Sequence, residues 1–185
     1  LVTEPALKPV PMRRDDGGID VLYLWPRSGY TDIYRHPLDG SSEPEVVVHG
    51  ERSPELESLH AASSRIDVRE HTLIFASKYH DRDALLFWDL KEKELVGRYQ
   101  FDDIVSIVSP AWSPDGERVA FNGLSNSGVS DLYVFEIRLG TLSRITADIY
   151  EDLVPGWLPG GSQLLRSWER FRKRVAHHCM RMPAR

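Results

Sequence analysis

The sequence holds a single cysteine, Cys179, and no long apolar run. One cysteine excludes an internal disulfide, and this usage fits a reducing compartment as well as a disulfide-free extracytoplasmic one. No apolar stretch approaches the roughly 18 residues that a membrane-spanning helix needs. We therefore expect no integral membrane segment, and the cysteine count leaves the compartment open.

Motifs that identify common enzyme classes are also missing. The sequence contains no G-x-S-x-G, no Walker phosphate loop, no G-x-G-x-x-G and no H-E-x-x-H. The run HHC at residues 177–179 does not suit one tetrahedral site, because consecutive residues on a helix point about 100° apart. The acidic pair at 102–103 and the run HDRD at 80–83 are typical of solvated loops and polar turns. We predict no catalytic residue, no cofactor and no metal site in this chain.

A repeat with a period near 45 to 50 residues is the main feature that is present. The segment SPAWSPDGERVAF (residues 109–121) is followed by a degenerate copy, VPGWLPGGSQLL, which starts at Val154, 45 residues after the first copy. Three short apolar segments that begin with Asp32, Asp83 and Asp131 lie 51 and 48 residues apart. Periods of this size, built of short strands, are typical of β-propeller blades, whereas helical solenoids would show an apolar period of 3.6 residues.

Local chemistry within the best copy predicts strands joined by tight turns. The segment 113–116 (SPDG) predicts a type I turn, since proline presets φ at the second position and glycine suits the fourth. Apolar residues alternate with others over 117–124, while residues 131–137 are largely apolar on both faces. A strand that is apolar on both faces suits the interior of a blade pressed between two neighbours.

The sequence therefore predicts an all-β chain, a partial β-propeller of about three to four four-stranded antiparallel blades. The blades are expected at about residues 21–50, 60–101 and 109–146, with the start of another at 152. Tandem β-sandwiches are disfavoured, because their units approach 100 residues. Since 185 residues leave little material for a closed ring, we expect the chain to be part of a longer protein.

The segment SPAWSPDGERVAFNGLSNSGVSDLYVFEIRLGTLSRIT (residues 109–146) resembles the TolB-like, WD40-like β-propeller repeat. That family includes periplasmic Tol–Pal translocation proteins and propeller domains attached to prolyl-oligopeptidase-type serine peptidases. The resemblance implies that a tryptophan packs beside the neighbouring blade and that a proline, an aspartate and a glycine form a hairpin. It implies an extracytoplasmic location but no particular chemistry, because propellers host many unrelated functions. The residues that carry the repeat in this chain are Trp112, Pro114, Asp115, Gly116, Asp131, Tyr133 and Trp157.

The two ends of the chain differ from its body. Residues 1–20 are rich in proline and predict a linker or extended segment, and no signal peptide is visible. Residues 162–185 carry seven Lys or Arg against one Glu, a net charge of +6, so the rest of the chain carries −11. This basic tail is predicted to be an amphipathic helix that could contact an acidic surface, fold back on the acidic propeller, or be a truncated or interrupted end. The side chains expected along its apolar side are Leu164, Trp168, Phe171, Val175 and Cys179.

The leading functional hypothesis is a noncatalytic binding scaffold for protein or peptide partners. Loops at residues 26–31, 78–82 and 125–130 join the second and third strands of successive blades, so they should emerge on one rim. The alternative is an accessory propeller that gates substrates for a peptidase domain elsewhere in a longer polypeptide. Nucleic acid is disfavoured as a partner, because the propeller portion is acidic and its aromatic residues are expected in the core.

Overall fold

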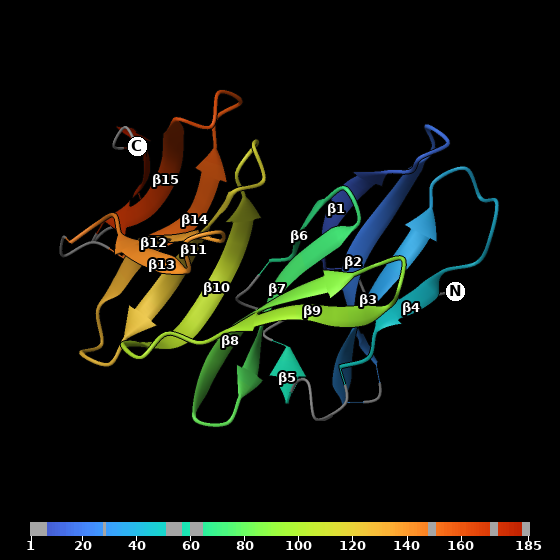
Figure 1. The fold of residues 1–185 in the computed structure, drawn as a ribbon, viewed down its shortest axis with the longest axis horizontal. Helices are drawn as coiled ribbons and strands as arrows, with labels where there is room; N and C mark the ends of the chain where they lie inside the picture. Colours follow the sequence, from blue (N-terminus) through green and yellow to red (C-terminus); the bar gives the residue numbers. More distant parts are fainter. Residues whose placement is uncertain are drawn as a thin grey trace.

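The described residues form a β-propeller arrangement without helices. The computed structural model describes residues 7–27, 29–50, 57–59, 65–147, 151–170 and 174–182, which form sixteen strands in four antiparallel sheets. Figure 1 shows the sheets following one another in chain order, from blue near the N-terminus to red near the C-terminus. The predicted all-β partial propeller is confirmed. The parts of the predictions that concern residues 1–6, 28, 60–64, 171–173 and 183–185 lie outside the described residues.

Strands of each sheet follow one another along the chain. The first sheet holds β1 (Leu7–Arg13), β2 (Ile19–Arg27), β3 (Tyr30–Pro37) and β4 (Glu45–Val48). The second holds β5 (Ser58–Leu59), β6 (Asp67–Arg69), β7 (Thr72–Tyr79), β8 (Arg82–Asp89) and β9 (Glu94–Tyr99), with β5 and β6 both paired to β7. The third holds β10 (Ile104–Trp112), β11 (Arg118–Ser125), β12 (Ser130–Glu136) and β13 (Thr141–Arg144). The fourth holds β14 (Glu151–Trp157), β15 (Gln163–Arg170) and β16 (Arg174–Arg181).

Secondary structure at the two ends differs from the predictions. Residues 7–13, which the sequence assigns to a linker, form β1 and pair with β2. The helix predicted over residues 162–185 is wrong, because the described residues there form β15 and β16. Burial alternates with the period of a strand, since Leu164 is 0% exposed and Leu165 is 39% exposed. Leu164 packs with Ala120 of the third sheet, and this long-range contact overrides the helical spacing of the segment.

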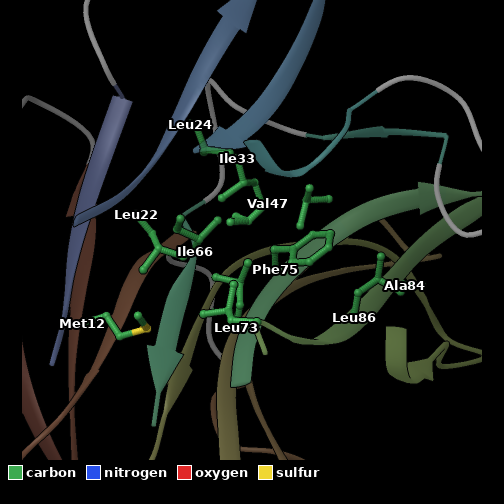
Figure 2. Close-up of a cluster of buried hydrophobic side chains, with 12 residues drawn as sticks. Met12, Leu22, Leu24, Ile33, Val47, Ile66, Leu73, Phe75, Ala84 and Leu86 are labelled. Atoms are coloured by element: carbon green, nitrogen blue, oxygen red, sulfur yellow. The ribbon is translucent and has the colours of Figure 1, made fainter. Parts of the chain in front are cut away.

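Apolar clusters fill the interfaces between neighbouring sheets. Between the first and second sheets, Leu22 and Ile33 lie opposite Leu73 and Phe75, and Figure 2 shows these side chains converging. A second cluster joins the second sheet to the third, and a third cluster joins the third sheet to the fourth. Each inner sheet therefore buries both of its faces.

The two faces of the third sheet differ in the size of their side chains. Phe121, Tyr133 and Phe135 belong to the cluster shared with the second sheet, whereas Ala120 and Leu132 belong to the cluster shared with the fourth. Successive residues of a strand point to opposite faces, so a sheet with two buried faces requires apolar residues at consecutive positions. This explains why the segment around Phe135 is apolar almost throughout.

Three aspartates near the starts of third strands bind the chain that leads into the next sheet. Each carboxylate accepts a hydrogen bond from a group beyond its own strand, which lies after the last strand of the sheet for Asp32 and Asp131 and in β10 of the next sheet for Asp83. The bonds run to Asp32 Oδ1 from the Gly50 N–H (2.8 Å), to Asp83 Oδ2 from the Ile107 N–H (2.8 Å), and to Asp131 Oδ1 from the Thr146 hydroxyl (3.2 Å). The regular spacing of these aspartates in the sequence therefore reflects the same role in three successive sheets.

Two tryptophans tie neighbouring sheets together. Trp112 Nε1 donates to Thr72 O in the second sheet at 3.3 Å, and Trp157 Nε1 donates to Ala111 O in the third sheet at 3.1 Å. The ring of Trp112 also meets Phe87 edge to face, with 5.5 Å between the centroids. Each indole N–H thus donates a hydrogen bond to a main-chain carbonyl of the preceding sheet.

Removal of the Asp83 carboxylate should destabilise the propeller. Asp83 is 3% exposed, and Asp83→Ala leaves the buried Ile107 N–H without its acceptor. We expect the free energy of unfolding to fall by about 1–3 kcal/mol in a urea titration. Asp103→Ala, which removes an exposed carboxylate from a turn, should change it by less than about 0.5 kcal/mol. Equal losses in the two variants would contradict the role assigned to Asp83.

Candidate functional site

The predicted SPDG segment forms the turn between β10 and β11. The Gly116 N–H donates to Ser113 O at 2.9 Å, and Gly116 has a φ of 74°, which suits glycine. Asp115 Oδ1 accepts from the Ser113 hydroxyl at 2.5 Å and from the Glu117 N–H at 3.0 Å. Pro114 presets the backbone at the second position of this turn. These residues hold the hairpin, and the aspartate is its hydrogen-bond acceptor.

Arg118 joins this turn to the equivalent turn of the fourth sheet. Its Nη2 donates to Asp115 Oδ2 at 3.2 Å and to Gly161 O at 2.7 Å, and its guanidinium carbon lies 4.7 Å from the centroid of the Trp157 ring. The Gly161 N–H donates to Leu158 O at 2.9 Å, so the fourth sheet keeps a turn although it has no aspartate there. Arg118 therefore forms hydrogen bonds with residues of both turns.

The pKa of Asp115 lies well below its usual range. Burial of this carboxyl would raise its pKa, but the hydrogen bonds from Ser113, the Glu117 N–H and Arg118 outweigh burial and lower the pKa to about 2. The carboxylate stays charged throughout the physiological range. Its role in the structure is to stabilise the hairpin and its contact with Arg118.

Asp131 and Tyr133 lie on β12, beside a groove at one rim of the propeller. Asp131 is 0% exposed and pairs with Arg144 at 2.5 Å, and Tyr133 stacks on Phe121 with 5.9 Å between the ring centroids. Burial raises the pKa of Tyr133, so its hydroxyl stays protonated at neutral pH. The groove has a volume of about 680 Å³. Residues 100–104 and 125–127 supply most of its wall, with Tyr133, Leu142 and Arg144.

Hydrogen bonds connect two of the three loops that the sequence places on one rim. Asp102 O accepts from Arg82 Nη1 at 2.5 Å, beside the turn between β7 and β8, and from Asn126 Nδ2 at 3.1 Å, in the turn between β11 and β12. The Asn126 N–H donates to Asp103 O at 3.0 Å. These two turns and the segment 100–103 therefore form one continuous surface, on which the carboxylates of Asp102 and Asp103 are exposed.

A second cavity lies where the first strands of the sheets approach one another, and it has a volume of about 410 Å³. Its wall includes residues 8–10 from β1, residues 65–67 from the second sheet, residues 109–111 from β10, and Pro155 from β14. The strands β1, β6, β10 and β14 contact one another in sequence around it. We call it the axial cavity, because all four sheets contribute to it.

The wall of the axial cavity is built by the same irregularity in three sheets. The pairing register shifts between Leu7 and Val10 in β1, between Val108 and Ala111 in β10, and between Asp152 and Pro155 in β14. At two of these bulges the residue before a proline has a positive φ. These are Lys8 (53°) before Pro9 and Ser109 (54°) before Pro110. A bulge re-aims side chains and bends the strand, which sets the shape of the wall.

Charged groups on the axial wall come from the first two sheets. Burial and the nearby Arg65 both lower the pKa of Lys8. Burial raises the pKa of Asp67, while hydrogen bonds from the N–H groups of Trp112 and Val68, each 2.8 Å long, oppose that rise. Main-chain donors thus compensate the charge of the Asp67 carboxylate.

The sequence did not single out these axial residues. The signal that could have found them is an X-Pro pair at the start of successive repeats, namely Lys8-Pro9, Ser109-Pro110 and Val154-Pro155. Arg65 is not part of such a pair, because no proline follows it in the sequence. Only the strand pairing places it beside the others.

The described part of the chain holds neither a candidate metal cluster nor a candidate membrane-spanning helix. No group of three or more His, Cys, Asp or Glu residues there could hold a metal ion. The HHC run at 177–179 lies in β16, and Cys179 is a free, exposed thiol. No helix among the described residues is long and apolar enough to cross a membrane.

Comparison with known proteins supports the fold. No protein-family model matches the chain. It is similar to the structure of TolB from Acinetobacter baumannii, with a TM-score of 0.76 and 14% identity over 97% of this chain and 41% of that one. A putative TolB from Agrobacterium tumefaciens gives a TM-score of 0.68 with 18% identity, over 90% of this chain and 58% of that one. A puromycin hydrolase gives 0.65 with 12% identity, over 92% of this chain and 26% of that one. At identities this low, the structural similarity shows a shared propeller fold and nothing more. This chain spans about two fifths to three fifths of the length of the TolB chains.

Acid should remove the contribution of Asp115 to stability. Because its folded pKa is about 2 and its ordinary value is 3.8, ionised Asp115 stabilises the fold above about pH 4, and this contribution is lost as the pH falls toward 2. Its side chain is 40% exposed, so we expect no more than about 1 kcal/mol. Urea titrations of the wild type and Asp115→Asn should therefore differ at pH 7 and converge near pH 2. A difference that stays constant over this range would contradict the assignment.

Proposed function

We propose that this chain is a noncatalytic β-propeller scaffold that binds a protein or peptide partner through one rim and the axial cavity. The observation that carries the proposal is the continuity of the rim, where Arg82 and Asn126 from two sheets share the carbonyl of Asp102. Loops that are bonded to one another present a preorganised surface, which lowers the entropy cost of binding. The groove of about 680 Å³ beside them supplies a concave element.

Two exposed carboxylates on this rim, beside the cations Arg82 and Arg144, can pair with basic groups of a partner. Asp102 and Asp103 are exposed at the mouth of the groove. Complementary charge accelerates association and selects among partners more than it raises affinity. We therefore propose a protein or peptide with exposed Lys or Arg as the partner of the rim, and we do not propose nucleic acid.

An extracytoplasmic location is part of the same proposal. It is supported by the likeness of the fold to two TolB structures and by the repeat at residues 109–146. The free thiol of Cys179 fits either compartment, so location can be tested independently by fractionating cells that express the gene.

A substrate-gating propeller of a larger peptidase is the second candidate. The observation that favours it is the likeness to a puromycin hydrolase, of which this chain covers 26%. The two candidates differ in what accompanies the propeller in the complete reading frame. A G-x-S-x-G with later aspartate and histidine would favour the peptidase, and its absence would favour the scaffold.

Replacing the two bonded rim turns should abolish partner capture. The test variant carries Gly-Ser sequences at residues 80–81 and 126–129, and the matched control carries them at 138–140, in the turn between β12 and β13 at the opposite ends of the strands. Quantitative pull-downs from a cell-envelope extract should show at least one protein whose capture falls about tenfold in the test variant and persists in the control. An identical set of captured proteins for the two variants would overturn the proposal.

A further inference from the structure

The groove at the rim, of about 680 Å³, carries two carboxylates on a fixed segment of main chain. Asp102 and Asp103 line it and are exposed, and their side chains make no hydrogen bond or ion pair with any described residue. Asn126 holds the segment, because its Nδ2 donates to Asp102 O at 3.1 Å and its N–H donates to Asp103 O at 3.0 Å. The two carboxylates are therefore held ready for a ligand, which lowers the entropy cost of binding.

Two guanidinium groups lie beside these carboxylates, and each is paired with another acid. Arg82 Nη2 lies 2.9 Å from Asp81 Oδ2, and Arg144 Nη2 lies 2.5 Å from Asp131 Oδ2. Once these two pairs are counted, the charge left over at the groove is that of the two unpaired carboxylates. A cation placed there would be attracted, whereas an anion would be repelled.

Tyr133 supplies a polar group that has no partner of its own. Its side chain is 7% exposed and lines the groove, yet its hydroxyl makes no hydrogen bond to the part of the chain that the structure describes. The ring stacks on Phe121, and a Cβ on Gly123 would lie only 2.8 Å from its Cδ2 atom, so the ring is packed directly on β11. Burial is the main cause of the raised pKa of Tyr133, and the charge of Asp103 adds to it, which places that carboxylate near the hydroxyl.

Apolar side chains line the groove beside these polar groups. Phe101 and Leu142 are half-buried there, and Ile104 is buried. A long cationic side chain suits such a surface, because its methylene stem covers apolar carbon while its charged head reaches polar groups. A small inorganic cation would leave the apolar part of the groove uncovered.

On the basis of the binding function proposed above, we propose that this groove takes a lysine or arginine side chain of the partner. Its charged head bonds the Asp103 carboxylate and the Tyr133 hydroxyl, with Asp102 at the mouth, and its stem packs on Phe101 and Leu142. A groove of about 680 Å³ also accommodates the neighbouring residues of the same peptide. The shared chemistry is a cationic head on an apolar stem.

An NMR titration of the full 185-residue chain tests this proposal. The probes are tripeptides with neutral ends, N-acetyl-Ala-X-Ala-amide, in which X is lysine, arginine, norleucine or glutamate. Norleucine keeps an apolar stem without a charge, and glutamate carries the opposite charge. At pH 7 and low ionic strength, a cationic peptide should shift the amide signals of Asp103, Ser127 and Tyr133 and bind at least about tenfold more tightly than the norleucine peptide. Added salt should weaken its binding, because the attraction is between charges.

A conservative pair of variants assigns a part of the binding to the hydroxyl. Tyr133→Phe keeps the ring and removes the hydroxyl, so it should weaken binding of the cationic peptide at least about threefold. Tyr30→Phe removes a hydroxyl from a side chain that is 48% exposed and does not line the groove, and it should leave the affinity unchanged.

A second pair of variants tests the charge. Asp102→Asn with Asp103→Asn should weaken binding of the cationic peptide at least about tenfold. Glu92→Gln with Glu94→Gln removes the same charge from exposed positions that do not line the groove, and it should have no effect. Thermal unfolding verifies that all the variants are folded. If the norleucine or glutamate peptide binds as tightly as the cationic peptides, or if either test variant behaves like its control, the proposal is overturned.

The remaining comparisons identify the cation and separate the two proposals. Tighter binding of the lysine or of the arginine peptide identifies the partner's residue, equal affinities indicate that the groove accepts both, and each of these results supports a cation site. Loss of partner capture in the rim variant, with no preference of the wild type for cationic peptides, would leave the scaffold and remove the cation site. Such a preference without any rim-dependent partner would do the opposite.

Discussion

The burial of both faces of every inner sheet is the constraint on which this molecule depends. The second and third sheets carry apolar side chains toward each neighbour, so neither could be stable in water alone. Stacking sheets satisfies this requirement but does not by itself fix their order or spacing. Directional bonds do so, because the indoles of Trp112 and Trp157 each bond a carbonyl of the preceding sheet. Asp32 and Asp83 add a second set of bonds, because their carboxylates accept the N–H groups of Gly50 and Ile107.

Repetition of the same sheet has a consequence at the axis. Bulges in β1, β10 and β14 interrupt the pairing at corresponding places, and two of them hold a pre-proline residue at positive φ. The cavity wall is therefore assembled from equivalent positions of different repeats, and its chemistry varies with the residue found at each. Lysine and arginine occupy two of these positions, at Lys8 and Arg65.

Charged side chains lie at both the rim and the axial cavity. The rim displays Asp102 and Asp103 on loops that are bonded to one another, while the axis presents Lys8 and Arg65 within a small volume. Turn residues such as Asp115 and Arg118 take no part in either surface, since they hold hairpins and join the third sheet to the fourth.

The amino-acid sequence by itself determined the repeat, the turn at 113–116 and the all-β propeller fold, because hairpins depend on local turn chemistry and on alternation within a few residues. It did not determine the secondary structure of the two end segments. Residues 7–13 are proline-rich, and residues 162–181 show a helical apolar spacing, yet the described parts of both segments are strands. Their conformation is decided by contacts with residues far away in the chain, such as Leu164 on Ala120. The axial cavity could not be predicted from the sequence either, since only strand pairing and sheet stacking bring Lys8, Arg65 and Ser109 together.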